Sequence, residues 1–377
     1  YKFLFSLLFS LILGGMVATQ AVADDYACQV NTLIGTKGTG LTSGYLYPGA
    51  TYPYGMVQFT PSYFSKRSGF VINQLSGGGC EHMGNFPTFP VKGKLKMSPD
   101  NILNYRINIS EEKGHAGYYE AMVQEDIKAK LTVTERTGMA SYEYPADQQY
   151  GTIIIGGGIS ATPIEQAAIV ITAPNKCEGY AEGGNFCGLR TPYKVYFVAE
   201  FDTDALETGT WKREELMPNT TFAEGEYSGV YFTFDVNKKK NIQYKIGVSY
   251  VSVENARENL KAENTEWDFQ KIQNQAEAKW NHYLGMIEVE GTNPDRTTQF
   301  YTHLYRSFIH PNVCSDVNGE YMGADFRVHK SRSKHYTSFS NWDTYRTQIQ
   351  LLSMLDPEVA SDIVISHQLF AEQSGGS

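Results

Sequence analysis

The order of apolar and polar positions divides the chain into two parts with different periods. Up to about residue 253, short runs of β-branched and aromatic residues alternate with polar residues, as in Tyr193–Phe201 and Ile242–Val253. Turns rich in Gly, Asn, Asp and Pro separate these runs. Many strands without helices between them predict an antiparallel sandwich of two sheets over residues 24–253.

One hairpin in this part can be predicted in more detail. Residues 128–136 and 139–145 both alternate, and Thr137 and Gly138 lie between them. Glycine can adopt the positive φ of a tight turn, so we place the turn at Thr137 and Gly138.

The period becomes that of a helix near residue 255. Apolar residues recur every three or four positions over residues 255–284, which predicts one or two amphipathic helices. The short run Met286–Glu290 has the alternation of a strand. Helical spacing returns in three further segments, 295–309, 342–355 and 357–373.

These periods predict a helical linker over residues 254–290 and the first helices of an all-α domain over residues 291–377. The last helical pattern stops just before the glycines at 375 and 376. Because so few helices cannot close a helical barrel, we expect this domain to be incomplete at its C-terminal end.

Composition narrows the function classes. The chain has 377 residues, 41% of them hydrophobic, which is enough for more than one packed core. Its formal net charge is -9, so there is no basic excess to neutralise a phosphate backbone, and binding to nucleic acid is not expected. The 26 Tyr and 20 Phe suit strands, and they also suit surfaces on which sugar rings stack.

The first residues have the pattern of a signal peptide. Lys2 precedes the apolar run Phe3–Val17, and Ala21-Val22-Ala23 forms a small-residue cleavage site. Residues 1–23 are therefore expected to be removed from an exported protein. The run is too short for a membrane-spanning helix, which needs about 20 apolar residues. Because no Met precedes this pattern, the N-terminal end is also expected to be incomplete.

The five cysteines match no zinc pattern, and export permits disulfides. Cys177 and Cys187 flank a polar stretch rich in glycine. They either form a bridge or are two unrelated buried thiols, and their spacing leaves both open. An odd count leaves at least one free thiol, for which Cys314, in a helical region, is our choice.

The densest unusual segment is Ser76–Pro90, which we call the glycine loop. Three consecutive glycines allow close approach of the backbone to a ligand, and polar residues follow at once. The residues considered for binding are Gly79, Cys80, Glu81, His82 and Asn85. The alternative is a turn-rich loop with incidental polar residues. The loop lacks the Gly-Lys-Ser/Thr ending of a phosphate-binding loop.

A second segment, Ser338–Arg346, places Trp342 beside Asp343 where a helical pattern begins. An indole next to a hydrogen-bond acceptor suits the flat face and the hydroxyls of a sugar. The alternative is structural: Asn341 or Asp343 caps the helix, Trp342 belongs to the core, and Arg346 pairs with Asp343.

Further loop segments carry no strong functional signal. Leu46–Gln58, rich in Pro, Gly and aromatic residues, is predicted to be mainly a turn. His115, Asp325–Arg327 and His329 are polar residues in loops, without an assigned role.

Together these segments resemble the family 92 glycoside hydrolases, which are exported, calcium-dependent α-mannosidases. The resemblance rests on the order and spacing of seven segments: Asn31–Thr36, Pro48–Ala50, Pro53–Val57, Gly79–Pro90, His115–Tyr119, Tyr301–His310 and Trp342–Arg346. It covers nearly the whole chain after residue 23.

The resemblance implies an N-terminal β-sandwich, a helical linker and an (α/α)6 barrel, of which residues 291–377 would form the first helices. The active site would lie between the two domains. Trp342 and Asp343 would bind mannose, and five residues of the glycine loop would face them: Gly79, Cys80, Glu81, His82 and Asn85. The partner would be an α-mannoside oligosaccharide or glycan.

The resemblance also implies the chemistry. It points to an inverting hydrolysis with a general acid and a general base, assisted by a bound Ca²⁺ with oxygen ligands. In the family, both catalytic carboxylates and most calcium ligands would follow Ser377. We therefore assign no catalytic residue within this chain, and we expect the 377-residue chain alone to be inactive.

Alternatives remain at this stage. The residues Glu81–Pro87 differ from the form of the loop in members that cleave α-1,2 links. The mannosidic link that the protein would cleave is therefore left open, and mannose joined through phosphate is one of the possible substrates. A non-catalytic carbohydrate-binding protein would also suit an exported, aromatic-rich β-domain, and so would a structural module of the cell surface. For each, a periplasmic or extracellular bacterial location is expected.

Overall fold

The computed structural model describes residues 25–36, 46–62, 69–99 and 108–376. The predicted signal peptide, residues 1–23, lies outside the described residues. Among the helices that are described, none has the length and apolar character needed to cross a membrane.

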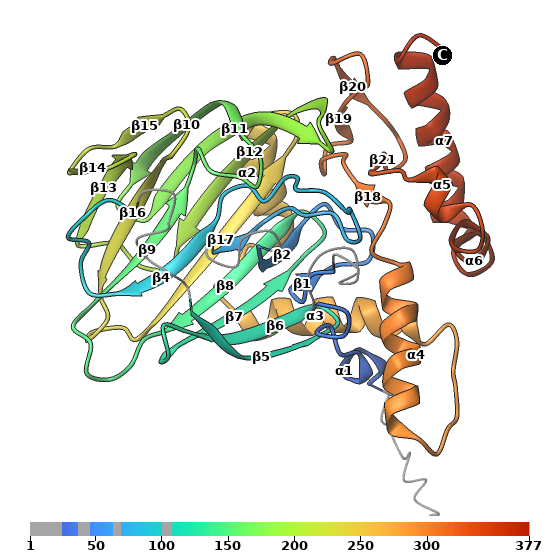
Figure 1. The fold of residues 1–377 in the computed structure, drawn as a ribbon, viewed down its shortest axis with the longest axis horizontal. Coiled ribbons are helices and arrows are strands. Elements are labelled where there is room, and N and C mark those ends of the chain that lie inside the picture. Colours follow the sequence, from blue (N-terminus) through green and yellow to red (C-terminus); the bar gives the residue numbers. More distant parts are fainter. Residues whose placement is uncertain (1–24, 37–45, 63–68, 100–107, 377) are drawn as a thin grey trace, which may run out of the picture.

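Two antiparallel sheets form the β-sandwich that the alternating pattern predicts (Figure 1). In the described part of the chain, one sheet has the order β1 (Ala50–Thr51), β2 (Gln58–Pro61), β3 (Phe70–Val71), β4 (Thr88–Lys92), β9 (Tyr150–Gly156), β16 (Ser228–Asp235), β13 (Glu207–Lys212) and β14 (Glu215–Pro218). The other has the order β15 (Phe222–Glu224), β10 (Ile164–Ala173), β11 (Lys176–Phe186), β12 (Leu189–Phe201), β17 (Asn241–Ser249), β8 (Thr137–Glu143), β7 (Ile127–Val133), β6 (Tyr118–Val123) and β5 (Ile109–His115).

The core lies between these sheets. Side chains of β11 alternate between buried and partly exposed along most of the strand, as expected for a strand with one face on the core. β9 and β16 are neighbours and are buried almost continuously. Residues of both sheets join one hydrophobic cluster, which includes Ile154, Phe197 and Phe232.

Seven helices are described, and their polar caps explain where several of them begin. They are α1 (Tyr26–Gln29), α2 (Val253–Glu263), α3 (Phe269–Leu284), α4 (Pro294–Ser307), α5 (Asn341–Thr344), α6 (Gln348–Leu355) and α7 (Pro357–Gln373). The side chains of Ser252, Asp268, Asn293 and Asp356 accept hydrogen bonds from the first backbone N–H groups of α2, α3, α4 and α7. A β-sandwich followed by helices confirms the predicted fold class.

Between α4 and α5 the chain forms two small two-stranded sheets. One pairs β18 (Asn312–Val313) with β21 (Tyr336–Thr337), and the other pairs β19 (Glu320–Met322) with β20 (Val328–Lys330). Figure 1 shows these strands and α5–α7 on one side of the sandwich, the side on which β11 ends.

The helices are attached to the sandwich by a second hydrophobic cluster with polar links. Trp280 of α3 is fully buried, and its Nε1 donates to the carbonyl oxygen of Thr51 over 2.7 Å. The Thr51 hydroxyl lies 2.7 Å from the hydroxyl of Tyr305 in α4. The segment Leu46–Gln58 contributes Tyr47 and Tyr54 to the same cluster. This segment is therefore more than a turn, because it supplies the surface on which the helices pack.

The predicted hairpin turn at Thr137 and Gly138 is wrong. These residues begin β8, and Gly138 pairs with Val133 of β7, so the turn falls at residues 134–136. A Cβ on Gly138 would lie 2.8 Å from side-chain atoms of both Phe59 and Ile72. The glycine is needed for close packing in the core and not for a positive φ.

Three other expectations need correction. Met286–Glu290 forms no strand, because this segment only connects α3 to α4. The single helix expected over residues 342–355 is divided by a turn at Tyr345–Thr347 into α5 and α6. The strand expected to reach Val253 ends at Ser249, and Val253 begins α2.

Candidate functional site

The glycine loop follows β3 and its last three residues begin β4, while residues 72–87 have no regular secondary structure. Gly77 and Gly79 are exposed and have φ values of 75° and 72°, which favour glycine. A Cβ on Gly79 would meet nothing within 4 Å. Backbone conformation, rather than crowding by neighbours, therefore accounts for glycine at position 79.

His82 is buried inside this loop, with 4% of its surface exposed. Its Nε2 accepts a hydrogen bond from the backbone N–H of Leu75 over 2.7 Å, which leaves Nδ1 to donate to the carbonyl oxygen of Cys80 over 2.6 Å. Burial lowers the pKa of His82, so the ring is neutral near pH 7. His82 thus holds the two ends of the glycine run together from inside.

Asn85 is also buried and belongs to the support of the loop. Its Oδ1 accepts from Asn73 Nδ2 over 3.1 Å and from the Tyr193 hydroxyl over 2.7 Å. Its backbone N–H donates to Asn73 Oδ1 over 2.8 Å. Since Asn85 has no exposed surface, its contact with a ligand would have to be indirect.

Cys80 forms a disulfide with Cys187, and the Cα atoms lie 5.4 Å apart. The possible bridge between Cys177 and Cys187 does not form, because Cys177 lies at the start of β11 and Cys187 just after its end. Ten residues of extended strand separate them by roughly 30 Å, far beyond the reach of a disulfide. Cys177 is a free thiol in the core. Cys314 is free and buried, but it follows β18 and does not lie in a helix.

Glu81 is the one carboxylate among the five loop residues considered for binding, and it is exposed. Within the described part of the chain it forms no hydrogen bond or ion pair with another side chain. Its carboxylate therefore faces solvent, where it could meet a hydroxyl-rich ligand.

His310 connects the glycine loop to the helices, a role that its place in the sequence does not indicate. The backbone N–H of Ser76 donates to His310 Nε2 over 2.9 Å, and His310 Nδ1 lies 2.8 Å from Asn312 Oδ1. Asn312 Nδ2 donates to two carbonyl oxygens, so its Oδ1 is the acceptor for an N–H on Nδ1. Gln348 of α6 donates to the carbonyl oxygen of His310 over 3.2 Å.

Trp342 and Asp343 lie in the short helix α5 on the helical side. Trp342 is 81% exposed, so the structural alternative that assigns it to the core is wrong for the described residues. The Asp343 carboxylate accepts from the Ser340 hydroxyl, and Arg346 contacts Tyr345. In the described residues, Trp342 and Asp343 form no hydrogen bond with the glycine loop. Hydrogen bonds of His310 with Ser76 and Gln348 connect the glycine loop to α6.

Calcium does not fit the described residues on their own. Among them, no group of three or more His, Cys, Asp or Glu side chains could hold a metal ion. Glu81 lies on the glycine loop and Asp343 in α5, where its carboxylate is engaged by Ser340. We therefore derive no step through a metal from these residues.

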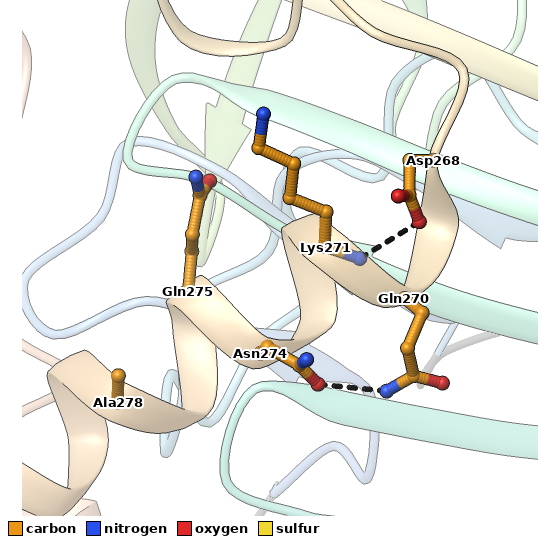
Figure 2. Close-up of a pocket in the computed structure, with 6 residues that line it drawn as sticks. All are labelled: Asp268, Gln270, Lys271, Asn274, Gln275 and Ala278. Carbon is orange, nitrogen blue, oxygen red and sulfur yellow. Dashed lines mark hydrogen bonds between the residues drawn. The ribbon is translucent and has the colours of Figure 1, made fainter.

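A surface depression on α3 is separate from this site (Figure 2). It is lined by six residues of one helix and its cap: Asp268, Gln270, Lys271, Asn274, Gln275 and Ala278. Asp268 caps the backbone N–H of Lys271, and Gln270 bonds to Asn274 one turn later. These contacts stabilise the helix and bring no reactive groups together.

The sequence matches two consecutive family descriptions. Residues 29–249 match the glycosyl hydrolase family 92 N-terminal domain, and residues 255–376 match the glycosyl hydrolase family 92 catalytic domain. The chain belongs to glycosyl hydrolase family 92. The division between the two matches falls where the sandwich ends and α2 begins.

Solved structures of family 92 share this fold. An α-mannosidase from Bacteroides thetaiotaomicron is 26% identical, with a TM-score of 0.83 over 93% of this chain and 50% of its own. The same enzyme has been solved in complex with mannoimidazole. An inverting mannosidase of the same organism has a TM-score of 0.79 at 24% identity, which shows the fold alone.

A relative outside the solved structures is an uncharacterized secreted glycosidase of Arthroderma benhamiae. It is 26% identical over 90% of this chain and 48% of its own length. The chain thus spans about half the length of the relatives that it matches. The resemblance to family 92 inferred from seven short segments is confirmed.

Sequence reasoning found the glycine loop but missed three residues that hold it. Spacing in the sequence suggests only Cys177, ten residues away, as a partner for Cys187, although five cysteines allow other pairings. Tyr193 was read only as part of a strand, and His310 was noted only in a matching segment. Their roles depend on contacts between positions far apart in the chain, for which spacing gives no signal.

Proposed function

We propose that the complete protein is an exo-acting α-mannosidase that hydrolyses α-1,2 or related mannosidic links of mannans or N-glycans. The observation that carries this proposal is the likeness, over 93% of this chain, to an α-mannosidase solved with mannoimidazole. The exposed indole of Trp342 and the Asp343 carboxylate beside it would bind mannose, and Gly79–Glu81 would face them from the sandwich.

The proposal includes inversion and dependence on calcium. An inverting reaction uses a carboxylic acid to protonate the leaving oxygen and a carboxylate about 6.5–9.5 Å away to activate water. We assign neither role to Glu81 or Asp343, and the calcium ligands are expected outside the described residues. Export to the periplasm or the extracellular space is part of the same proposal.

The test is mannose release by the full-length gene product from α-1,2-, α-1,3- and α-1,6-mannobiose and from mannose 1-phosphate esters. We expect release from at least one of these substrates, loss of release with a calcium chelator, and β-mannose as the first product by NMR. Release that survives chelation would remove calcium from the proposal. Saturable mannoside binding without release would favour the non-catalytic carbohydrate-binding alternative.

A variant connects the activity to this site. Trp342→Ala in the full-length product should raise KM up to about tenfold, because an aromatic contact contributes about 0.5–1.5 kcal/mol beyond the area that it buries. Trp267→Ala is the matched control, since Trp267 is an indole between α2 and α3 that is 37% exposed. Equal effects of the two substitutions would contradict a sugar-binding role for Trp342.

A further inference from the structure

The tip of the β11–β12 hairpin reaches the glycine loop. β11 ends at Phe186 and β12 begins at Leu189, so Cys187 and Gly188 form the tip, with φ values of 53° and 80°. Figure 1 shows that β11 ends on the side of the sandwich that faces α5–α7. The tip therefore lies beside the site proposed above, although no pattern in the sequence indicates a role for it.

Three contacts of different kinds join the hairpin to the loop. The disulfide joins Cys187 to Cys80. The Phe186 ring meets the His82 ring edge to face, with centroids 5.7 Å apart and planes at 76°. Tyr193 donates its hydroxyl proton to Asn85 Oδ1 over 2.7 Å. Each contact falls on a loop residue that the sequence had singled out for binding.

These contacts differ in which part of the loop they hold. His82 and Asn85 are buried, and Ser76 is held by His310, so both flanks of the loop are fixed by hydrogen bonds. The stretch Gly77–Glu81 is exposed or partly exposed and contains three glycines, which have the largest conformational freedom to lose. His82 holds the Cys80 carbonyl oxygen from within the loop, and among the described residues the covalent attachment of this stretch to the sandwich is the bond from Cys80 to Cys187.

We propose that the hairpin tip is a positioning element for mannoside binding, with Cys187 and Phe186 as positioning residues that hold Gly79–Glu81 in place. This inference rests on the proposed function. A loop that is ordered before the substrate arrives does not have to be ordered by it, so affinity is higher. Fixing one or two residues corresponds to about a tenfold change in affinity.

The first test is Cys187→Ser in the full-length gene product. We expect KM to rise about tenfold and kcat to stay within about twofold, because the hairpin is assigned a role in positioning and none in the chemical step. Phe186→Ala should raise KM about threefold, and Phe186→Tyr should restore it, since the edge contact with His82 is kept. Mass spectrometry of a digest of the unreduced wild type should detect the two peptides that contain Cys80 and Cys187 joined by a disulfide.

Two controls are matched to these variants. Cys28→Ser removes an exposed free thiol away from the loop, and Phe222→Ala removes a half-exposed ring on β15. Both should leave KM unchanged. If Cys187→Ser does not fold, the folded wild type can be treated with a dithiol, which gives two protein thiols and the oxidised reagent, and KM is measured again.

The outcomes separate this inference from the proposed function. Hydrogen exchange at residues 77–81 should become faster in Cys187→Ser, whether or not mannose is released. If the wild type releases no mannose but exchange becomes faster, the proposed function fails and the positioning of the loop stands. Unchanged exchange, or a lower melting temperature with unchanged KM, would overturn the positioning role.

Discussion

The glycine loop and the helices α5–α7, the two sides of the proposed site, differ in how many contacts hold them within this chain. On the sandwich side, a disulfide, buried polar side chains and His310 hold the glycine loop. On the helical side, Trp342 is 81% exposed, and α6 and α7 also expose Met354 and Val364 at 79% and 64%. Among the described residues, contacts within this chain thus hold the glycine loop, whereas α5–α7 expose several large apolar side chains.

The largest loss in the free energy of unfolding is expected from a substitution at the junction between the sandwich and the helices. Arg136, at the turn before β8, is 8% exposed, and its Nη1 bonds to Glu135 over 2.6 Å and to Glu263 at the end of α2 over 2.7 Å. Its Nε donates to the carbonyl oxygen of Ser315 over 2.7 Å. One guanidinium thus joins the sandwich, α2 and the segment after β18.

Arg136→Met should lower the free energy of unfolding by about 3 kcal/mol, because it leaves the largely buried Glu263 without its cation and Glu135 with Lys334 alone. Although burial opposes ionisation, Arg136 and Lys334 hold the pKa of Glu135 below its usual range. Urea unfolding of the 377-residue chain measures the effect. Arg257→Met, which removes a more exposed pair with Glu178, should cost about 1 kcal/mol or less. Similar losses from both would contradict a special role of the buried network.

The second largest effect on the free energy of unfolding is expected at His310, and it should appear as the pH is lowered. Burial lowers the pKa of His310 to about 4, whereas the unfolded value is near 6.5. Between these values the unfolded state binds more protons, so the free energy of unfolding should fall by roughly 2 kcal/mol as the pH drops from 6.5 to 4. His335, whose pKa is also about 4 through burial, adds to this loss in the same range.

His310→Gln should make the acid loss smaller, because the amide does not titrate in this range and can still accept from the N–H of Ser76. The slope of the free energy of unfolding against pH between 4 and 6.5 measures it. His303→Gln, an exposed position in α4, is the control and should leave the slope unchanged. The same slope in all three proteins would show that His310 is protonated when folded.

A smaller effect is expected at Lys245 of β17, beneath the connection between α2 and α3. Its Nζ donates to the carbonyl oxygen of Asn264 over 2.9 Å and lies 4.0 Å from the ring centre of Trp267. Burial lowers the pKa of Lys245 to about 8, against about 10.5 when unfolded. The unfolded state therefore binds more protons between pH 8 and 10.5, and this group should make the protein more stable as the pH rises through that range.

We expect this gain to be roughly 1–2 kcal/mol after allowance for solvent near Lys245. Lys245→Met should remove it, which unfolding curves at pH 8 and pH 10 would show. Lys279→Met, in α3, is the control. A wild type whose stability does not rise would mean that Lys245 remains protonated.

The sequence predicted elements better than contacts, for physical reasons. Periods of two and of three to four residues depend only on which face of an element is buried, so the sandwich and the helices could be inferred. The Gly138 turn was misplaced because glycine serves both turns and close packing, and local sequence does not separate them. Cys80 and Cys187 are 107 residues apart, and their pairing follows from strand order, which no local pattern encodes.

The smallest effect on stability should come from the residue with the strongest functional signal. Trp342→Ala in the 377-residue chain should change the free energy of unfolding by less than about 0.5 kcal/mol, because an 81% exposed side chain loses little burial. Trp280→Ala, which empties a fully buried site between α3 and the sandwich, should cost about 3–5 kcal/mol. Urea unfolding compares the two directly. A loss above about 1.5 kcal/mol for Trp342→Ala would show that its indole packs within this chain, and it would then no longer be available as a platform for a sugar.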